Sequence, residues 1–225
     1  MNKDIIFEDN HLLVINKPAG ALSQPDGSSA KDVLTFYKNY LKKRDKKPGN
    51  VFLGLVHRLD RPVGGVLVLA KTSKAAGRLS EQIRSRTVKK TYLVVVEGDT
   101  PVNALLEGYI KKDRKLNKVS VIHKPAHGAK IAQLTYIKLE SYQNLSLLEV
   151  DLQTGRPHQI RAQMADSGYP VYGDQKYGTA GTDKNPALFS HMFNLEHPTQ
   201  KIRMNFEAFP PPAEPWTFFT TLIRE

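Results

Sequence analysis

The chain has 225 residues, a formal net charge of +11, a sequence pI near 9.7 and no cysteine. Its length is sufficient for one hydrophobic core, and 40% hydrophobic with 24% charged residues is an ordinary globular composition. Without cysteine, disulfides, thiolate nucleophiles and cysteine-ligated metal clusters are excluded. The basic excess fits a partner of phosphate-rich polymers and equally a merely basic soluble protein, because net charge does not define a site.

The N-terminal residues lack the charged-then-apolar layout of a signal peptide. No apolar run approaches the ~20 residues of a membrane-spanning helix. We therefore expect a cytoplasmic protein that does not use a membrane.

The first predicted element is a strand at Leu12–Ile15, which ends in a turn at residues 16–20. Ser29 and Asp32 have capping-box spacing and predict the start of a helix. The apolar face of this helix would be formed by residues at helical period, namely Val33, Tyr37, Tyr40 and Leu41. The basic tract at residues 42–49 is expected to be a solvated loop.

The middle of the chain predicts a buried strand at Val66–Ala70, a helix around residues 76–83 and a strand at Tyr92–Val96. Two further strands, at 131–139 and 145–152, are separated by five residues. This length suits an antiparallel hairpin, which argues against a purely parallel sheet.

Pro157 suits the first turn of a helix that runs toward Gly168. Residues 179–186 are expected to form a surface loop. The last predicted elements are strands at 188–195 and 202–206 and a short helix at 216–223. Together the elements predict one α+β domain over residues 1–225, with a mixed, largely antiparallel central sheet flanked by helices and loops.

A first polar cluster, residues 54–65, lies between two apolar runs. It places Asp60 between Arg58 and Arg61 and ends in paired glycines. Loops carried by buried strands are common places for functional sites. The alternative is an Arg–Asp ion pair that closes a turn, and the residues alone leave both interpretations open.

A second cluster, residues 154–161, carries Arg156 and Arg161 around the expected helix start. A helix N-terminus offers free backbone N–H groups and a partial positive charge, so the cluster predicts an anion pocket. The alternative is a structural site for a carboxylate, for which Asp60 is the best candidate.

These clusters resemble the signatures of the RluA-type pseudouridine synthases. Residues 57–60 with Gly65 and Ala70-Lys71 are similar to HRLD-x-x-x-x-G-x-x-x-x-A-K, and residues 155–161 are similar to GRxHQIR. Further similar segments are 14–20, 90–93, 170–174 and 191–198. The chain departs from the pattern at Val63-Gly64, where relatives usually have Thr-Ser. The opening motif begins almost at residue 1, so we expect the small N-terminal RNA-binding module of many relatives to be missing.

The resemblance implies an isomerase that converts uridine in RNA to pseudouridine. Asp60 would be the nucleophile, attacking the base or the anomeric carbon, and Arg161 would pair with it and keep it ionised. Tyr92 would stack on the flipped base or take part in proton transfer, although a tyrosine in a strand is more often simply core. The histidines are scattered and no phosphate-binding glycine loop is present, so we expect no metal and no cofactor.

The resemblance also implies that the target uridine flips out and that Arg58 inserts into the RNA stack. Further expected substrate-binding residues are His57, Arg156, His158 and Gln159. The expected partner is structured ribosomal or transfer RNA, bound by a monomer. The alternatives are a non-catalytic RNA-binding protein, which has no use for a desolvated carboxylate, and a small-molecule hydrolase, which does not explain the charge.

Overall fold

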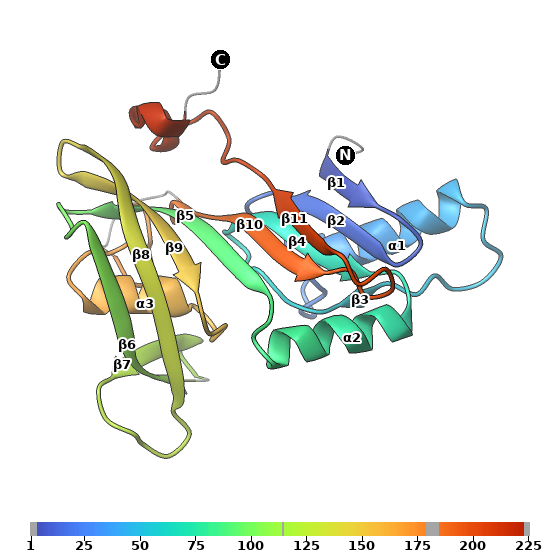
Figure 1. Ribbon diagram of the computed structural model, residues 1–225, viewed down its shortest axis with the longest axis horizontal. Helices are drawn as coiled ribbons and strands as arrows, with labels where there is room; N and C mark the ends of the chain where they lie inside the picture. The colour runs from blue at the N-terminus through green and yellow to red at the C-terminus, as the bar shows by residue number, and fades with distance from the viewer. Residues whose placement is uncertain (1–3, 114, 179–184, 223–225) are drawn as a thin grey trace. The chain divides into compact units, whose positions relative to one another are not determined.

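The computed structural model describes residues 4–113, 115–178 and 185–222, in which the chain forms two compact units. Unit 1 consists of residues 1–89 and 190–208, and unit 2 of residues 90–189 and 209–225. Strands and helices occur in both units (Figure 1). The predicted α+β class is therefore confirmed.

The sheet of unit 1 is built on buried apolar strands. Its order is β1 (Ile5–Glu8), β2 (Leu12–Lys17), β4 (Gly64–Ala70) and β10 (Leu188–Glu196), with β3 (Gly54–Leu55) on β4 and β11 (Arg203–Glu207) on β10. All seven residues of β4 are buried. The strands predicted from apolar runs are confirmed here, because a strand covered on both faces reads as a continuous apolar run.

Two helices belong to unit 1. In α1 (Val33–Arg44) the N-cap is Asp32, whose carboxylate accepts a hydrogen bond from the Thr35 N–H at 2.8 Å. The expected start at Ser29 was wrong, because Asp32 is still extended and forms a β-bridge with Leu22, so the helix can begin only after it. α2 (Ser73–Arg84) begins after the N-cap Thr72 and lies alongside β3 and β4 (Figure 1).

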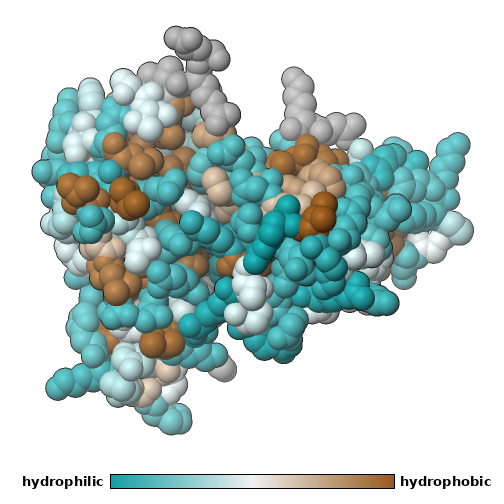
Figure 2. Space-filling view, in the orientation of Figure 1, coloured by the Kyte–Doolittle hydropathy of each residue, from teal (hydrophilic) through white to brown (hydrophobic). Residues whose placement is uncertain are grey.

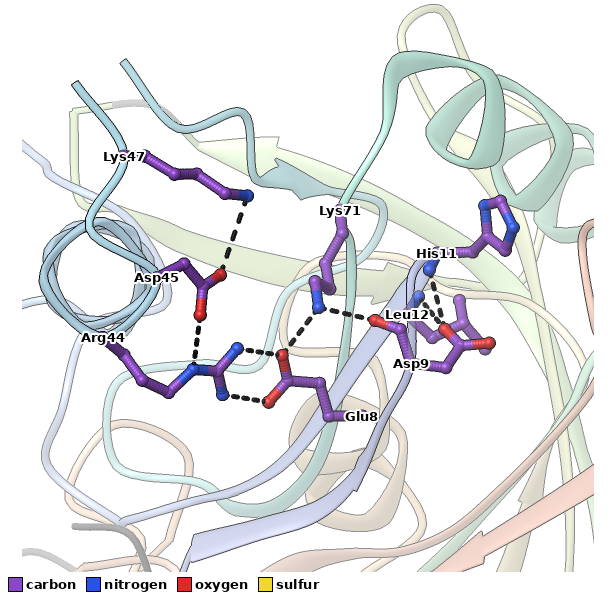
Figure 3. A network of polar contacts seen from close by, with 8 residues as sticks. All are labelled: Glu8, Asp9, His11, Leu12, Arg44, Asp45, Lys47 and Lys71. Carbon is purple, nitrogen blue, oxygen red and sulfur yellow. Dashed lines mark hydrogen bonds and ion pairs between the residues drawn. The ribbon is translucent and has the colours of Figure 1, made fainter. Parts of the chain in front are cut away.

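The basic tract at 42–49 is only partly a loop, since Lys42–Arg44 form the last turn of α1. Arg44 donates two hydrogen bonds to the Glu8 carboxylate and one to Asp45, each at 2.7 Å (Figure 3). Lys71 contacts the same Glu8 carboxylate at 2.6 Å. These ion pairs attach the end of α1 to β1, so part of the positive charge of the tract is neutralised within the fold.

The sheet of unit 2 has the order β5 (Lys89–Glu97), β9 (Leu145–Leu152), β8 (Lys130–Tyr142), β6 (Asn103–Asp113) and β7 (Lys118–Ile122). The predicted antiparallel hairpin is confirmed in β8 and β9. β9 has the expected bounds, but β8 runs further than expected, which leaves a turn at Gln143 and Asn144 with Gln143 at φ 51°. β6 and β7 had not been predicted.

One helix, α3 (Gln159–Asp166), packs on the sheet of unit 2, where Ala162 belongs to one buried cluster with Ile110, Val119 and Ala132. The outward side chains of β6 and β8 include exposed apolar residues, namely Leu105, Ile131, Ile137 and Leu139. Figure 2 shows apolar atoms dispersed among hydrophilic ones over this unit.

The C-terminal segment forms two 3-10 turns, Trp216–Phe218 and Thr220–Leu222, and not the predicted α-helix. Pro215 is the N-cap of the first turn. The Glu140 carboxylate holds the second turn through hydrogen bonds from the backbone and hydroxyl groups of Thr220 and Thr221.

Residues 179–184 of the expected surface loop lie outside the described residues. Of the helices in the described part of the chain, none combines the length and the apolar character needed to span a bilayer.

Candidate active site

Asp60 of unit 1 lies in the loop between β3 and β4, and this loop is tied to a turn formed by residues 17–23. The Gly20 N–H donates to the Arg61 carbonyl at 2.8 Å, and the Arg61 Nε donates to the Gly20 carbonyl at 3.1 Å. Within the loop, the Val63 N–H donates to the Asp60 carbonyl at 3.0 Å. The backbone on the C-terminal side of Asp60 is therefore fixed by several hydrogen bonds.

Lys17 is a residue of this site that the sequence analysis did not single out. Its side chain is fully buried, and its Nζ donates to the carbonyls of Pro18, Ala21 and Arg61 at 3.1, 2.7 and 3.2 Å. Burial lowers the pKa of Lys17 from 10.5 to about 8, although the charge of Asp60 acts in the opposite direction. Unit 1 thus places a buried cation in the electrostatic field of Asp60.

The sequence did contain a signal for Lys17. Side chains alternate along a strand, so Leu13, Ile15 and Lys17 share one face of β2. Leu13 and Ile15 are fully buried. A lysine that continues a buried face must find partners inside the protein, which marks it as a residue with a specific task.

His57 and Arg58 precede Asp60 in the same loop and differ in their surroundings. The His57 Nε2 accepts a hydrogen bond from the Val68 N–H at 3.0 Å, and its ring lies 4.6 Å from that of Phe193. Arg58 is exposed. The structure therefore gives His57 an anchoring contact to β4 and leaves Arg58 accessible to a ligand.

Unit 2 carries the other predicted site residues. Tyr92 lies in β5 opposite Val150 of β9 and is 7% exposed. Arg161 lies in the first turn of α3, which begins at Gln159, two residues after Pro157. The residue before the helix, His158, has φ 51°, which interrupts the helical backbone after the proline.

The Arg161 guanidinium is held by a buried carboxylate. Its Nε and Nη2 donate to the two oxygens of Asp174 at 2.6 and 2.7 Å, and its Cζ lies 5.2 Å from the centre of the Tyr177 ring. Burial raises the pKa of Asp174, but the hydrogen bonds and charge of Arg161 outweigh burial and hold this pKa below its ordinary value of 3.8. Two parallel N–H···O bonds fix the plane of a guanidinium as well as its position.

Gln159 is buried and organises the loop that precedes α3. Its Oε1 accepts hydrogen bonds from the Arg156 N–H and the Thr154 hydroxyl at 3.0 and 2.8 Å, and its Nε2 donates to the Gln133 carbonyl at 3.0 Å. The Arg156 Nε donates to the Ile131 carbonyl at 2.8 Å. These contacts give Gln159 a structural role in unit 2, in addition to the substrate contact expected from the sequence.

His158 and Tyr177 form a second link in the same region. The His158 Nδ1 lies 2.7 Å from the Tyr177 hydroxyl, which also accepts a hydrogen bond from the Val119 N–H at 2.9 Å. Because Tyr177 also contacts the Arg161 guanidinium, this tyrosine connects α3 to β7. In residues 4–113, 115–178 and 185–222, no group of three or more His, Asp or Glu side chains could hold a metal ion.

A model of the RNA pseudouridylate synthase family matches residues 11–166. Ribosomal large subunit pseudouridine synthase D of Xylella fastidiosa is 36% identical over 227 aligned residues, which cover 91% of this chain and 65% of the relative. The enzyme of the same name from Pseudomonas aeruginosa is 31% identical, covering 99% of this chain and 72% of the relative. This chain thus spans about two thirds of the length of these two relatives.

Solved structures show the same fold. Human RNA pseudouridylate synthase domain containing 4 superposes with a TM-score of 0.79 at 22% identity, over 93% of this chain and 89% of the human chain. Human RNA pseudouridylate synthase domain containing 1 superposes with a TM-score of 0.72 at 22% identity, over 93% of this chain and 83% of the human chain. The matched range includes both signature clusters, and the RluA-type resemblance is confirmed. This chain belongs to the RNA pseudouridylate synthase family.

Proposed function

We propose that this chain isomerises uridine to pseudouridine in RNA, with Asp60 as the nucleophile. The observation that carries the proposal is the Asp60 loop, whose backbone is fixed to residues 17–23 next to the buried cation of Lys17. In the reaction the N1–C1′ bond breaks and a C5–C1′ bond forms. The C5 proton leaves to solvent and N1 takes up a proton, so no net redox change and no hydrolysis occur.

Two residues of unit 2 would complete the chemistry. Arg161 would support the ionised nucleophile, since a guanidinium is always charged and Asp174 fixes its orientation. Tyr92 would support the flipped base by stacking or serve in proton transfer. We propose accordingly that both units act as one catalytic domain.

Binding of the RNA would draw on residues of both signatures. Arg58 is exposed and could insert into the stack that the flipped uridine leaves. His57, Arg156, His158 and Gln159 are the further proposed substrate-binding residues. The names of the bacterial relatives favour large-subunit ribosomal RNA over transfer RNA as substrate. We propose a monomer that works in the cytoplasm.

The test is pseudouridine mapping of total RNA from cells with and without the gene. We expect at least one position to lose pseudouridine in the deletion strain and to regain it when the wild-type gene is returned. Unchanged maps in all ribosomal and transfer RNAs would contradict the proposal.

The role of Asp60 is tested in the same complementation. Asp60→Asn and Asp60→Ala should restore no pseudouridine while RNA affinity stays near wild type, because the carboxylate reacts and does not anchor the RNA. Asp26→Asn, at an exposed turn of unit 1, is the matched control and should restore it. If Asp60→Asn kept more than a few per cent of wild-type activity, the proposed role of Asp60 as nucleophile would be wrong. Full RNA binding by a wild-type chain without turnover would favour the non-catalytic alternative.

A further inference from the structure

Ser23 makes an unusual pair of contacts with the residue just before Asp60. Its hydroxyl donates a hydrogen bond to the Leu59 carbonyl at 2.8 Å and accepts one from the Leu59 N–H at 3.2 Å. Ser23 is 5% exposed and Leu59 is 6% exposed, so water does not compete for these groups. One side-chain oxygen therefore satisfies both backbone polar groups of Leu59.

These two bonds complete the fixation of the Asp60 loop. On the C-terminal side of Asp60, the Arg61 carbonyl accepts hydrogen bonds from Gly20 and Lys17. On the N-terminal side, the contacts that turn 17–23 makes with Leu59 come from Ser23. The backbone is thus fixed on both sides of Asp60. Lys17 contributes through a charged group and Gly20 through its main chain, whereas Ser23 contributes through an uncharged side chain.

We propose that Ser23 is a positioning residue for the Asp60 carboxylate, which sets the rate of attack without touching the RNA. The inference rests on the proposed role of Asp60 as nucleophile. Removal of the hydroxyl leaves a buried N–H and a buried carbonyl unpaired, and the loop can relieve this cost only by moving. A displacement of about 1 Å at a reacting group can reduce a rate about 100-fold.

Ser146 of unit 2 provides the control that distinguishes a positioning role of Ser23 from a merely structural one. Its hydroxyl donates to the Gly98 carbonyl at 2.8 Å and accepts from the Thr100 N–H at 3.2 Å, and the residue is fully buried. Ser146→Ala therefore removes the same kind of donor and acceptor pair from a loop that carries no proposed site residue. Both serine-to-alanine variants should lower the Tm by several degrees.

The experiment measures single-turnover tritium release from [5-³H]uridine, with the transcript in which the wild-type chain forms pseudouridine. We expect Ser23→Ala to slow the saturating rate about 10- to 100-fold with RNA affinity within about twofold of wild type. Ser146→Ala should keep a near wild-type rate. Ser23→Thr, which retains a hydroxyl, should recover most of the rate, and it keeps the test decisive if Ser23→Ala folds poorly.

The failure of the inference can be distinguished from failure of the proposed function. If Asp60→Asn is inactive but Ser23→Ala and Ser146→Ala have equal rates, Asp60 is the nucleophile and the positioning role of Ser23 is wrong. A rate loss in Ser23→Thr as large as that in Ser23→Ala would also overturn it. If Asp60→Asn retains activity, the role of Asp60 itself is wrong, whatever Ser23 does, and the inference falls with it.

Discussion

The Asp60 loop of unit 1 and the start of α3 in unit 2 are held by different forces. Around Asp60 most bonds join uncharged groups, since Ser23 and Gly20 contact backbone N–H groups and carbonyls. Arg161 is instead oriented by the charged carboxylate of Asp174. Neutral hydrogen bonds fix a backbone over a wide pH range, whereas an ion pair depends on the ionisation of its carboxylate. The position of the proposed nucleophile should therefore respond less to acid than the position of Arg161.

The largest effect is expected at Gly65, just after the Asp60 loop. A Cβ at this position would lie 2.1 Å from the Ser190 carbonyl oxygen, and Gly65 has φ +114°. Backbone atoms cannot move away cheaply, so Gly65→Ala should cost at least about 4 kcal/mol of unfolding free energy or prevent folding. Urea unfolding monitored by circular dichroism measures it. Gly77→Ala in α2, where a Cβ meets no atom within 4 Å, is the control and should be neutral or stabilising.

The second effect is on the ion pair of unit 2. Asp174→Ala leaves the Arg161 guanidinium without its buried carboxylate, which should reduce the free energy of unfolding by about 3–5 kcal/mol. The measurement is chemical unfolding at neutral pH. Asp113→Ala, at the exposed C-terminal end of β6 in the same unit, should change stability by less than about 1 kcal/mol.

The same pair has a pH signature with a defined sign. The pKa of Asp174 is lower in the folded state than its ordinary 3.8, so its stabilisation is present above about pH 4 and is lost as pH falls through the folded pKa. Asp174→Asn should therefore flatten the loss of stability below pH 4. If the unfolding free energies of wild type and Asp174→Asn fell in parallel below pH 4, protonation of Asp174 would not be linked to unfolding.

The third effect concerns Lys17, the buried cation that contacts the Asp60 loop. Its pKa is about 8 in the folded state against 10.5 ordinarily, so between these values the unfolded chain binds a proton that the folded chain does not. Stability contributed by this group must then rise with pH across that window, by up to about 3 kcal/mol. From pH 8 to 10.5 the unfolding free energy of wild type should rise relative to that of Lys17→Met. A constant difference over this range would contradict a depressed pKa.

The smallest effect is on RNA binding, and its measurement shows which unit contacts the RNA phosphates. Arg86 and Lys89 of unit 1 are exposed, whereas Arg84 is already paired with Glu81. Arg86→Ala and Lys89→Ala should each reduce the slope of log K against log salt by about 0.7–0.9 without changing the modified uridine. Binding isotherms from 50 to 200 mM salt measure this. The matched variants Lys111→Ala and Lys112→Ala in unit 2 should leave the slope unchanged. If instead these two reduced the slope and the unit 1 variants did not, the phosphate contacts would lie in unit 2.

Sequence patterns predicted the buried strands well and the exposed ones poorly. β4 was identified because all its residues are buried and apolar, as a strand covered on both faces requires. β6 has one buried residue, Ile110, and ends in Lys111, Lys112 and Asp113, so no local apolar pattern marks it. It pairs with β7 and also with β8, whose partner residues lie 20 to 34 positions away in sequence and so outside a local window.

The candidate site shows the same division. Asp60, Arg161 and Tyr92 were named because the signatures resemble a family, and their roles remain predictions. Ser23 was missed because its importance lies in its contacts with Leu59, 36 residues away. The buried face of β2 marks Lys17 as a residue with a specific task, but its contact with Arg61, 44 residues away, is visible only in the structure. A family signature identifies reacting groups, whereas the contacts that hold them become visible only when the backbone is known.

The path of the chain between the two units has a consequence for synthesis on the ribosome. Unit 1 is interrupted by the 100 residues from 90 to 189 before β10 is complete. At about 5–20 residues per second, this interval lasts roughly 5–20 s. During it, the edge of β4 that β10 later covers has apolar side chains and unpaired backbone groups. The nascent chain therefore passes through a stage of several seconds in which one edge of β4, all of whose residues are buried in the folded chain, is open to chaperones or to another nascent chain.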